Sequence, residues 1–374
     1  MILKNFRSTG ERRIALEKGL RVDLQNIGSY TLSEQVASSR NCENMIGAAQ
    51  IPLGVAGPLR VGEKDYYVPL ATTEGALVAS VNRGCKAISE SGGAIVDSYR
   101  VGATRGPVFK VNSWQENTKL YDFIMGNKEK FNELARLTSG HIKLIDVDAR
   151  CIGHHQFVRF SYDTQDAMGL NMVTIATQKI VDFIGKETGT RCLSLAGNFD
   201  IDKKPAWSNF IRGRGFEAWA EVTVPHKIIS NVLKTNARNV YETWLAKCMI
   251  GSAVSGSMGF NAHYANVIAA LFIATGQDPA HVVEGSLGIT TAEVVNGKDL
   301  YVSVYLPDLM VGTVGGGTGL ATQKEALTLL GVSNSQKFAE VAAGAVLAGE
   351  ISLLSSLSAG TLAQSHQKLA RGGA

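Results

Sequence analysis

The sequence contains little that would stabilise the fold covalently or bind a metal ion. Its five cysteines, at positions 42, 85, 151, 192 and 248, are scattered, odd in number and form no Cys-x-x-Cys pair. This pattern favours reduced thiols in the cytoplasm over a disulfide framework. The seven histidines show no metal-ligand spacing, and the neighbours His154 and His155 cannot share one face of a helix. We therefore expect no metal site.

The marks of nucleic-acid binding, export and membrane insertion are also missing. The formal net charge is +4, without a Lys/Arg block, which argues against nucleic acid and suits a small anionic substrate. Residues 1–7 lack the apolar core of a signal peptide. Residues 341–363 are long enough to span a bilayer, but Glu350 lies near their centre, where a charge costs about 2.5–3.5 kcal/mol. We predict that they form a buried central helix in a soluble, cytoplasmic protein.

Neither of two glycine motifs has the context that phosphate binding needs. Residues 213–218 match G-x-G-x-x-A, but the dinucleotide fingerprint requires a helix to follow, and here a strand follows. Residues 251–256 have the glycine spacing of a phosphate-binding loop, but Ser257 stands where that loop needs lysine. The sequence therefore predicts no ordinary Rossmann or P-loop site.

What the chain does contain is room for two domains, with 374 residues and 40 glycines. Residues 107–195 alternate in the order βαββαβ, with a helix at 116–137, strands at 142–148 and 155–162, and a helix at 172–185. This order predicts a small ferredoxin-like domain. We expect an α+β fold, in which a large helix-rich domain surrounds the long central helix and the small domain is inserted. The predicted segments are a helical arm (1–40), the first part of the large domain (41–106), the insertion (107–195), a connecting loop (196–206), and the second part with a C-terminal tail (207–374).

Residues 66–91 contain the first candidate for catalysis. A strand at 66–70 precedes a predicted helix at 74–91, which Thr72 or Thr73 would cap. Glu74 would then lie in the first helical turn after a strand, where α/β folds tend to place ligands. Its simplest reading is a carboxylate that stabilises the helix dipole. A proton donor here would need burial or a second carboxylate to raise its pKa.

Three further candidates lie at the ends of elements or in turns. They are Lys203 in the loop 196–206, Asp278 just after a predicted helix at 263–275, and His366 near the end of the chain. Turns and element ends often carry catalytic groups. Lys203 and its neighbour Lys204 could equally be solvated surface, and spacing alone does not join these residues to Glu74.

Seven motifs in order resemble the hydroxymethylglutaryl-coenzyme A reductases, and most closely the eukaryotic and archaeal branch. They span about residues 43–371 and comprise residues 43–59, 71–75, 166–172, 197–205, 276–278, 312–318 and 365–366. The resemblance implies a dimer or higher homo-oligomer with the active site between subunits. It implies that nicotinamide hydride reduces the substrate thioester twice, giving mevalonate and coenzyme A, or that the reverse reaction runs.

The resemblance also implies roles for individual residues. Lys203 would stabilise the developing oxyanion, Glu74 would protonate the aldehyde oxygen with a pKa raised by Asp278, and His366 would protonate the departing thiolate. The matching positions include three sets of contacts: substrate residues Arg105, Asp202, Lys204, Lys247 and Asn266; coenzyme A residues Ser80, Asn82, Arg83 and Lys86; and nicotinamide cofactor residues Ser139, Gly140, His141, Asp166, Ala167, Met168, Gly169, Leu170 and Asn171. On simpler readings, Lys247 complements a helix dipole and Asn266 is a satisfied core amide.

The chain departs from the family pattern at several positions. Ala196 replaces a substrate-binding serine, Gly372 replaces a regulatory phosphorylation serine, and Gly140 replaces an arginine that faces the 2′-phosphate of NADPH. Asp146 and Asp148 follow, and a carboxylate favours a free ribose hydroxyl, so we expect NADH. Lys143 or His141 could serve the phosphate instead. Alternative functions are another NAD(P)H-dependent acyl-CoA reductase and a non-catalytic coenzyme A-binding regulator, which would have no need for a proton donor.

Overall fold

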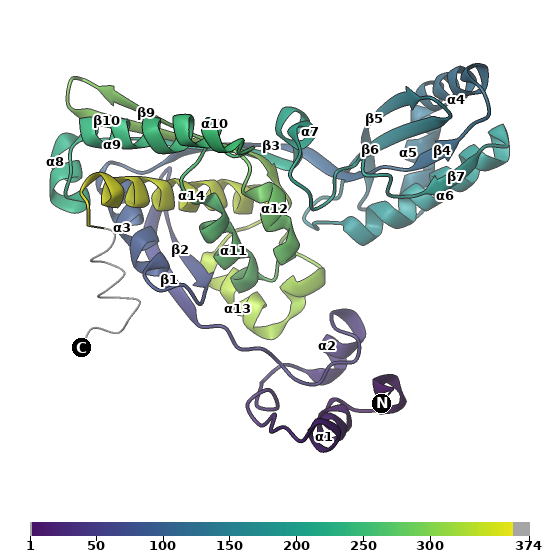
Figure 1. Cartoon of the computed structure of the whole chain (residues 1–374), viewed down its shortest axis with the longest axis horizontal. Helices are drawn as coiled ribbons and strands as arrows, with labels where there is room; N and C mark the ends of the chain where they lie inside the picture. Colours follow the sequence, from purple (N-terminus) through teal and green to yellow (C-terminus); the bar gives the residue numbers. More distant parts are fainter. Residues whose placement is uncertain (1, 362–374) are drawn as a thin grey trace.

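The structure, a computed structural model, describes residues 2–361. The predicted catalytic residue His366 lies outside them, as does Gly372. Two separate hydrophobic cores are present, a large one and a smaller one, and Figure 1 shows the smaller domain extending to one side of the larger. The predicted α+β class, with a small domain inserted in a helix-rich one, is confirmed.

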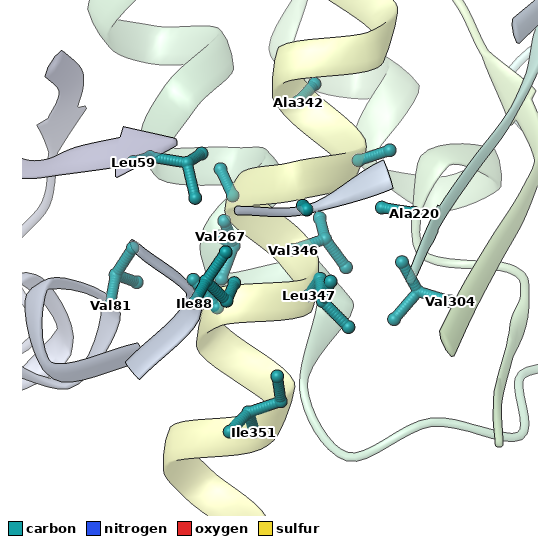
Figure 2. Close-up of a cluster of buried hydrophobic side chains, with 14 of the residues drawn as sticks. Leu59, Val81, Ile88, Ala220, Val267, Val304, Ala342, Val346, Leu347 and Ile351 are labelled. Carbon is teal, nitrogen blue, oxygen red and sulfur yellow. The ribbon is translucent and has the colours of Figure 1, made fainter. Parts of the chain in front are cut away.

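The large core surrounds α14 (Ser335–Ser358). It packs against α3 (Leu77–Glu90), α11 (Tyr264–Thr275), and the strands β3 (Ile95–Arg105), β8 (Arg214–Val224) and β10 (Asp299–Leu309). Figure 2 shows Val346, Leu347 and Ile351 of α14 among apolar side chains of α3, α11 and the sheet. Among the residues described, α14 is the one helix long and apolar enough to cross a membrane, but 83% of its most apolar window is buried in protein. The predicted buried central helix is thus confirmed.

One antiparallel sheet connects the two domains. In the large domain, β9 (Ile289–Val295) pairs with β10, β10 with β8, and β8 with β3. The far end of β3 pairs with β6 (His155–Asp163) of the small domain. The sequence of residues 101–107 predicts a turn that carries Arg105, but residues 101–105 are the end of a strand shared by both domains. Arg105 lies at this junction.

The small domain has the predicted βαββαβ order. Its strands β4 (Val108–Lys110), β5 (Lys143–Ile152), β6 and β7 (Arg191–Ser194) lie in the spatial order β7-β4-β6-β5, all antiparallel. This is the ferredoxin-like arrangement. The first helix is broken at Asn127 into α4 (Trp114–Gly126) and α5 (Lys128–Arg136), and α6 (Leu170–Thr188) is the second.

The remaining elements complete the large domain and the N-terminal segment. The sequence of residues 227–249 predicts one helix, but the structure does not form it: Lys234 is left-handed (φ 59°), and two π-helical stretches interrupt the run. The N-terminal segment holds η1 (Leu3–Asn5), α1 (Thr9–Leu20) and α2 (Glu34–Arg40) and is followed by the hairpin β1 (Leu53–Val61) and β2 (Lys64–Ala71). The others are α7 (Trp207–Arg212), α8 (His226–Ile228), η2 (Ile229–Leu233), α9 (Ala237–Trp244), η3 (Leu245–Gly251), α10 (Ser252–Ser255), η4 (Pro279–His281), α12 (Val282–Gly285), η5 (Gly316–Gly319) and α13 (Ala321–Leu330).

Candidate active site

The structure brings Lys203 and Asp278 together. The Lys203 ammonium Nζ lies 2.6 Å from Asp278 Oδ2, and each side chain is about one-third exposed, at 35% and 34%. Burial raises the pKa of the Asp278 carboxyl, but the hydrogen bonds from Lys203 and from the Ala280 N–H more than offset this, so its pKa lies below the usual range. The result is a partly desolvated ammonium–carboxylate pair that solvent and a ligand can reach.

A buried guanidinium holds the loop that carries Lys203. Arg214 is fully buried and donates to Asp202 Oδ1 at 2.8 Å and to Glu284 Oε1 at 2.7 Å. The same Glu284 oxygen accepts the backbone N–H of Lys203 at 2.9 Å and lies 2.9 Å from His281 Nδ1. Lys203 itself is left-handed, with φ 57°, and this network stabilises that backbone conformation.

Sequence reasoning missed Arg214, His281 and Glu284. Arg214 lies within a glycine motif that failed the nucleotide-binding test, and nothing in the spacing of the other two indicated burial. Asp202, His281 and Glu284 place possible ligand atoms within 4.8 Å of one another, which is close enough for a metal ion. Arg214 donates to both carboxylates, so their charge is already balanced by a cation.

Lys203 and Asp278 line a cavity of about 640 Å³ together with residues 167–172, of which 167–171 belong to the predicted cofactor set, and with glycines of residues 312–317. Asp166 fixes this loop to α14, because its carboxylate accepts the Ser335 N–H at 2.9 Å and the Ser335 hydroxyl at 3.1 Å. Gly169 has φ +81°, and a Cβ there would lie 2.4 Å from Thr164 Cγ2, so the position requires glycine.

The N-terminus of α6 follows Gly169 directly. No side chain caps it, and its first turn carries no acidic residue. Helix N-terminal N–H groups of this kind favour anionic groups such as a pyrophosphate. This end of α6, on the wall of the same cavity as Lys203, thus has the chemistry of an anion-binding site.

The residues expected near the adenine ribose lie elsewhere, in and around the turn before β5. His141 Nδ1 is 2.8 Å from Gln165 Oε1, and the His141 N–H donates to Ser139 Oγ at 3.1 Å. Asp148 is already paired with Arg150 at 2.8 Å and with Arg212. Because these arginines neutralise it, the carboxylate argument for NADH is weaker than the sequence suggested.

Glu74 does not lie in a helix, contrary to prediction. Helix α3 begins only at Leu77, after Ala76 in the left-handed region (φ 74°), and no side chain caps it. Thr72 Oγ1 instead accepts the Glu74 N–H at 2.9 Å, which forms a turn. The Glu74 carboxylate is exposed, and its Oε1 lies 3.3 Å from Asn266 Nδ2.

Glu74 and Asn266 lie at the opposite end of α11 from Asp278. Asn266 is the third residue of α11, whereas Asp278 follows its last residue, Thr275. These nine residues of helix correspond to roughly 13 Å along the axis. Within residues 2–361, no hydrogen bond or ion pair joins Glu74 to Lys203 or to Asp278. The predicted site residues therefore form two separate groups, Glu74 with Asn266 and Lys203 with Asp278, which we call half-sites.

Of the remaining predicted substrate residues, two lie on the Lys203 side and one lines a different cavity. Arg105 lies on the Lys203 side, 3.5 Å from Asp200 and 4.0 Å from Asp202. Lys204 Nζ donates to the backbone oxygen of Asp202 at 2.9 Å. Lys247, in the π-helical stretch η3, instead lines an open cavity of about 950 Å³ that begins beside the start of α11.

Three of the four predicted coenzyme A contacts on α3 are engaged within the fold. Ser80 Oγ lies 2.9 Å from Ser352 Oγ, and Arg83 donates to the Ser352 backbone oxygen at 2.6 Å. Burial lowers the pKa of Arg83. Asn82 Oδ1 accepts the Gly57 N–H at 2.9 Å, whereas Lys86 is exposed and lies 3.7 Å from Glu90.

Comparison with known proteins gives the chain a family. Residues 8–371 match the family model described as hydroxymethylglutaryl-coenzyme A reductase. The chain belongs to this family. Its identity with the 3-hydroxy-3-methylglutaryl-coenzyme A reductase of Methanothermobacter thermautotrophicus is 50% over 369 residues, which cover 96% of this chain and 93% of that protein. The resemblance inferred from the motifs is thereby confirmed, and the chain is an oxidoreductase.

A plant protein and a solved bacterial structure extend the comparison. The 3-hydroxy-3-methylglutaryl-coenzyme A reductase 1 of Hevea brasiliensis is 43% identical over 380 residues, covering 98% of this chain and 66% of that protein. The solved class II reductase from Streptococcus pneumoniae, bound to NADPH in open conformations, superposes with a TM-score of 0.71 at 18% identity, over 95% of this chain and 98% of that one. At this identity the likeness shows a shared fold.

Proposed function

We propose that this reductase converts hydroxymethylglutaryl-CoA to mevalonate and coenzyme A by two hydride transfers, or runs the reverse reaction. The observation that carries the proposal is the Lys203–Asp278 pair, at 2.6 Å, on the wall of the same cavity as residues 167–172. When bound beside this loop, the nicotinamide supplies the hydrides. A fixed ammonium then stabilises the negative charge that develops on the carbonyl oxygen.

The proton donors in this proposal are Glu74 and His366. Glu74 protonates the aldehyde oxygen after the second reduction, and His366 protonates the coenzyme A thiolate. Asp278 can act on Glu74 only if the two carboxylates approach each other. Since the half-sites lie at opposite ends of α11, we propose a homodimer or larger homo-oligomer in which Glu74 of one subunit faces the Lys203–Asp278 pair of the other.

The cofactor is NADH or NADPH. We favour NADH because Gly140 offers no charge to a 2′-phosphate, although Lys143 and His141 lie close enough in sequence to serve one. We place the enzyme in the cytoplasm, in keeping with its free cysteines. Nucleic acid and membrane are not among the partners we propose.

Two inactive variants test the chemistry and the sharing of the site together. Lys203→Met and Glu74→Gln should each lower kcat by about 10²- to 10³-fold, measured by cofactor absorbance with hydroxymethylglutaryl-CoA and either NADH or NADPH. If the two variants are mixed, unfolded and refolded together, half of the dimers are mixed, and each has one site with both residues intact. About a quarter of the wild-type activity should return.

The controls separate the parts of the proposal. Lys298→Met, in the turn between β9 and β10, should retain full activity. Refolding either variant with itself should restore nothing. A wild-type protein that oxidises neither cofactor contradicts the reaction, whereas two inactive variants that fail to complement each other contradict the shared site.

A further inference from the structure

His281 is buried beside the Lys203–Asp278 pair and has one unused nitrogen. Its ring is fully buried, and Nδ1 lies 2.9 Å from Glu284 Oε1. The other nitrogen, Nε2, has no hydrogen-bond partner among the residues described. It lies between two carboxylates, 3.9 Å from Asp278 Oδ2 and 4.0 Å from Asp202 Oδ1.

Glu284 fixes the orientation of this ring. Its Oε1 accepts from Arg214 at 2.7 Å and from the Lys203 backbone N–H at 2.9 Å. A carboxylate that receives two donors is an acceptor, so the Nδ1 proton belongs to the 2.9 Å bond with Glu284; Arg214 Nη1 lies farther from this nitrogen, at 3.4 Å. Such an interaction sets both the tautomer and the direction in which the opposite ring nitrogen points. Here Nε2 points between Asp278 and Asp202.

These contacts form a cycle of residues with one open link. The cycle runs from the Lys203 backbone to Glu284, from Glu284 to His281, and from Asp278 back to the Lys203 ammonium. The open link is the 3.9 Å between His281 and Asp278. One water molecule spans this distance, donating one hydrogen to Nε2, which is an acceptor when the ring proton is on Nδ1, and the other to the Asp278 carboxylate. A buried polar nitrogen left without a partner is costly, which favours closure.

We propose that His281 is a positioning residue for the reduction. Its Nε2 closes this link to Asp278, and the closed cycle of contacts holds the Asp278 carboxylate and the Lys203 ammonium at a fixed geometry facing the substrate oxygen. Glu284 is the shared anchor, since it holds both the Lys203 backbone and the ring of His281. The inference rests on the proposed function, because it concerns the geometry of the same ammonium.

Two amide substitutions separate the two nitrogens of His281. His281→Gln places a polar atom near the position of Nε2 but loses the hydrogen bond to Glu284. His281→Asn keeps a donor near the position of Nδ1 but loses the link to Asp278. We expect His281→Gln to retain kcat within about threefold. His281→Asn should lower kcat by about 10- to 100-fold, the range expected for one hydrogen bond to a charged group, with the KM for hydroxymethylglutaryl-CoA within about threefold of wild type.

The opposite order of the two variants, or equal effects of both, would overturn the inference, because the ring would then serve only Glu284 or general packing. In the Lys203→Met background, His281→Asn should cause less than about a twofold further loss, since both changes act on one unit. If His281→Asn lowers kcat in the Lys203→Met background by the same factor as in wild type, the inference is also overturned. Wild-type enzyme is assayed alongside: if it is inactive, the proposed function fails, whereas an active wild type with the wrong variant pattern rejects His281 alone.

Discussion

Glu350 gives the sharpest test of how the fold positions the site. It is fully buried in α14, where Oε1 accepts the His263 N–H at 2.7 Å. Its Oε2 accepts the Ala262 N–H at 2.8 Å and the Thr290 hydroxyl at 2.6 Å. These N–H groups belong to the two residues just before α11, and the first N–H of the helix itself, that of Tyr264, donates to Asn261 Oδ1 at 3.2 Å. The carboxylate of α14 therefore holds the segment that leads into α11.

We expect Glu350→Gln to lower the free energy of unfolding by about 3 kcal/mol. The amide keeps the volume and one acceptor oxygen, but its NH₂ group must face donors that a carboxylate oxygen received. Hydrogen bonds to a charged group contribute about 1.5–3 kcal/mol each, and a donor left unpaired in the core adds its desolvation cost. With an m value near 3 kcal/mol/M in urea, the unfolding midpoint should fall by about 1 M.

The measurement is urea unfolding followed by far-ultraviolet circular dichroism. Thr290→Val is the matched control, because it removes one of the three donors and leaves the carboxylate in place, and it should cost about 1 kcal/mol. A midpoint for Glu350→Gln within about 0.2 M of wild type, or a loss no larger than that of Thr290→Val, would refute the view that this charge holds the segment that leads into α11.

Two further predictions concern close packing and acid. A Cβ on Gly84 would lie 1.9 Å from the Ala348 backbone oxygen, so Gly84→Ala must push α3 away from α14 and should lower the free energy of unfolding by about 1–3 kcal/mol. Thermal unfolding measures this loss, with Gly10→Ala as the control, because a Cβ on Gly10 meets no atom within 4 Å. A midpoint for Gly84→Ala that is as little changed as that of Gly10→Ala would contradict the packing. Because the pKa of Asp278 is lowered below its usual 3.8, stabilisation by its pair with Lys203 is complete above that value and is lost as the pH falls through the lowered pKa. The stability difference between wild type and Lys203→Met, measured by urea unfolding, should therefore shrink on acidification below about pH 3.8, and a difference that grows there would oppose this assignment.

The sequence predicted those parts of the fold that depend on pattern alone. The long apolar run around Glu350 indicated α14, and the alternation of strands and helices indicated the ferredoxin-like domain. The predictions that failed depend on single backbone conformations. Ala76 gives no sign in the sequence that it is left-handed, so Glu74 was assigned to a helix that begins three residues later. In the same way, Lys234 ends a helix that periodicity continues.

The residues of the candidate site also fall into those that the sequence indicated and those that it did not. Lys203 and Asp278 were recognisable because they lie in motifs, and the structure pairs them. Arg214, Glu284 and His281 were not, because what makes them important is burial against residues distant in the chain. Arg214 lies 70 positions from Glu284, with which it pairs at 2.7 Å. Tertiary contacts of this kind leave no local trace in a single sequence.

The rigidity of α11 argues for association of two chains. The segment that leads into it is held by Glu350 and its end by Gly276, where a Cβ would lie 2.3 Å from the Gly317 backbone oxygen. With both ends fixed, Glu74 and Asn266 stay roughly 13 Å along the helix axis from the Asp278 end unless packed backbone is disrupted. Bringing a second chain alongside requires no such disruption. Docking a second subunit is therefore the less costly way to join the two half-sites, and the refolded mixture of Lys203→Met and Glu74→Gln measures whether that happens.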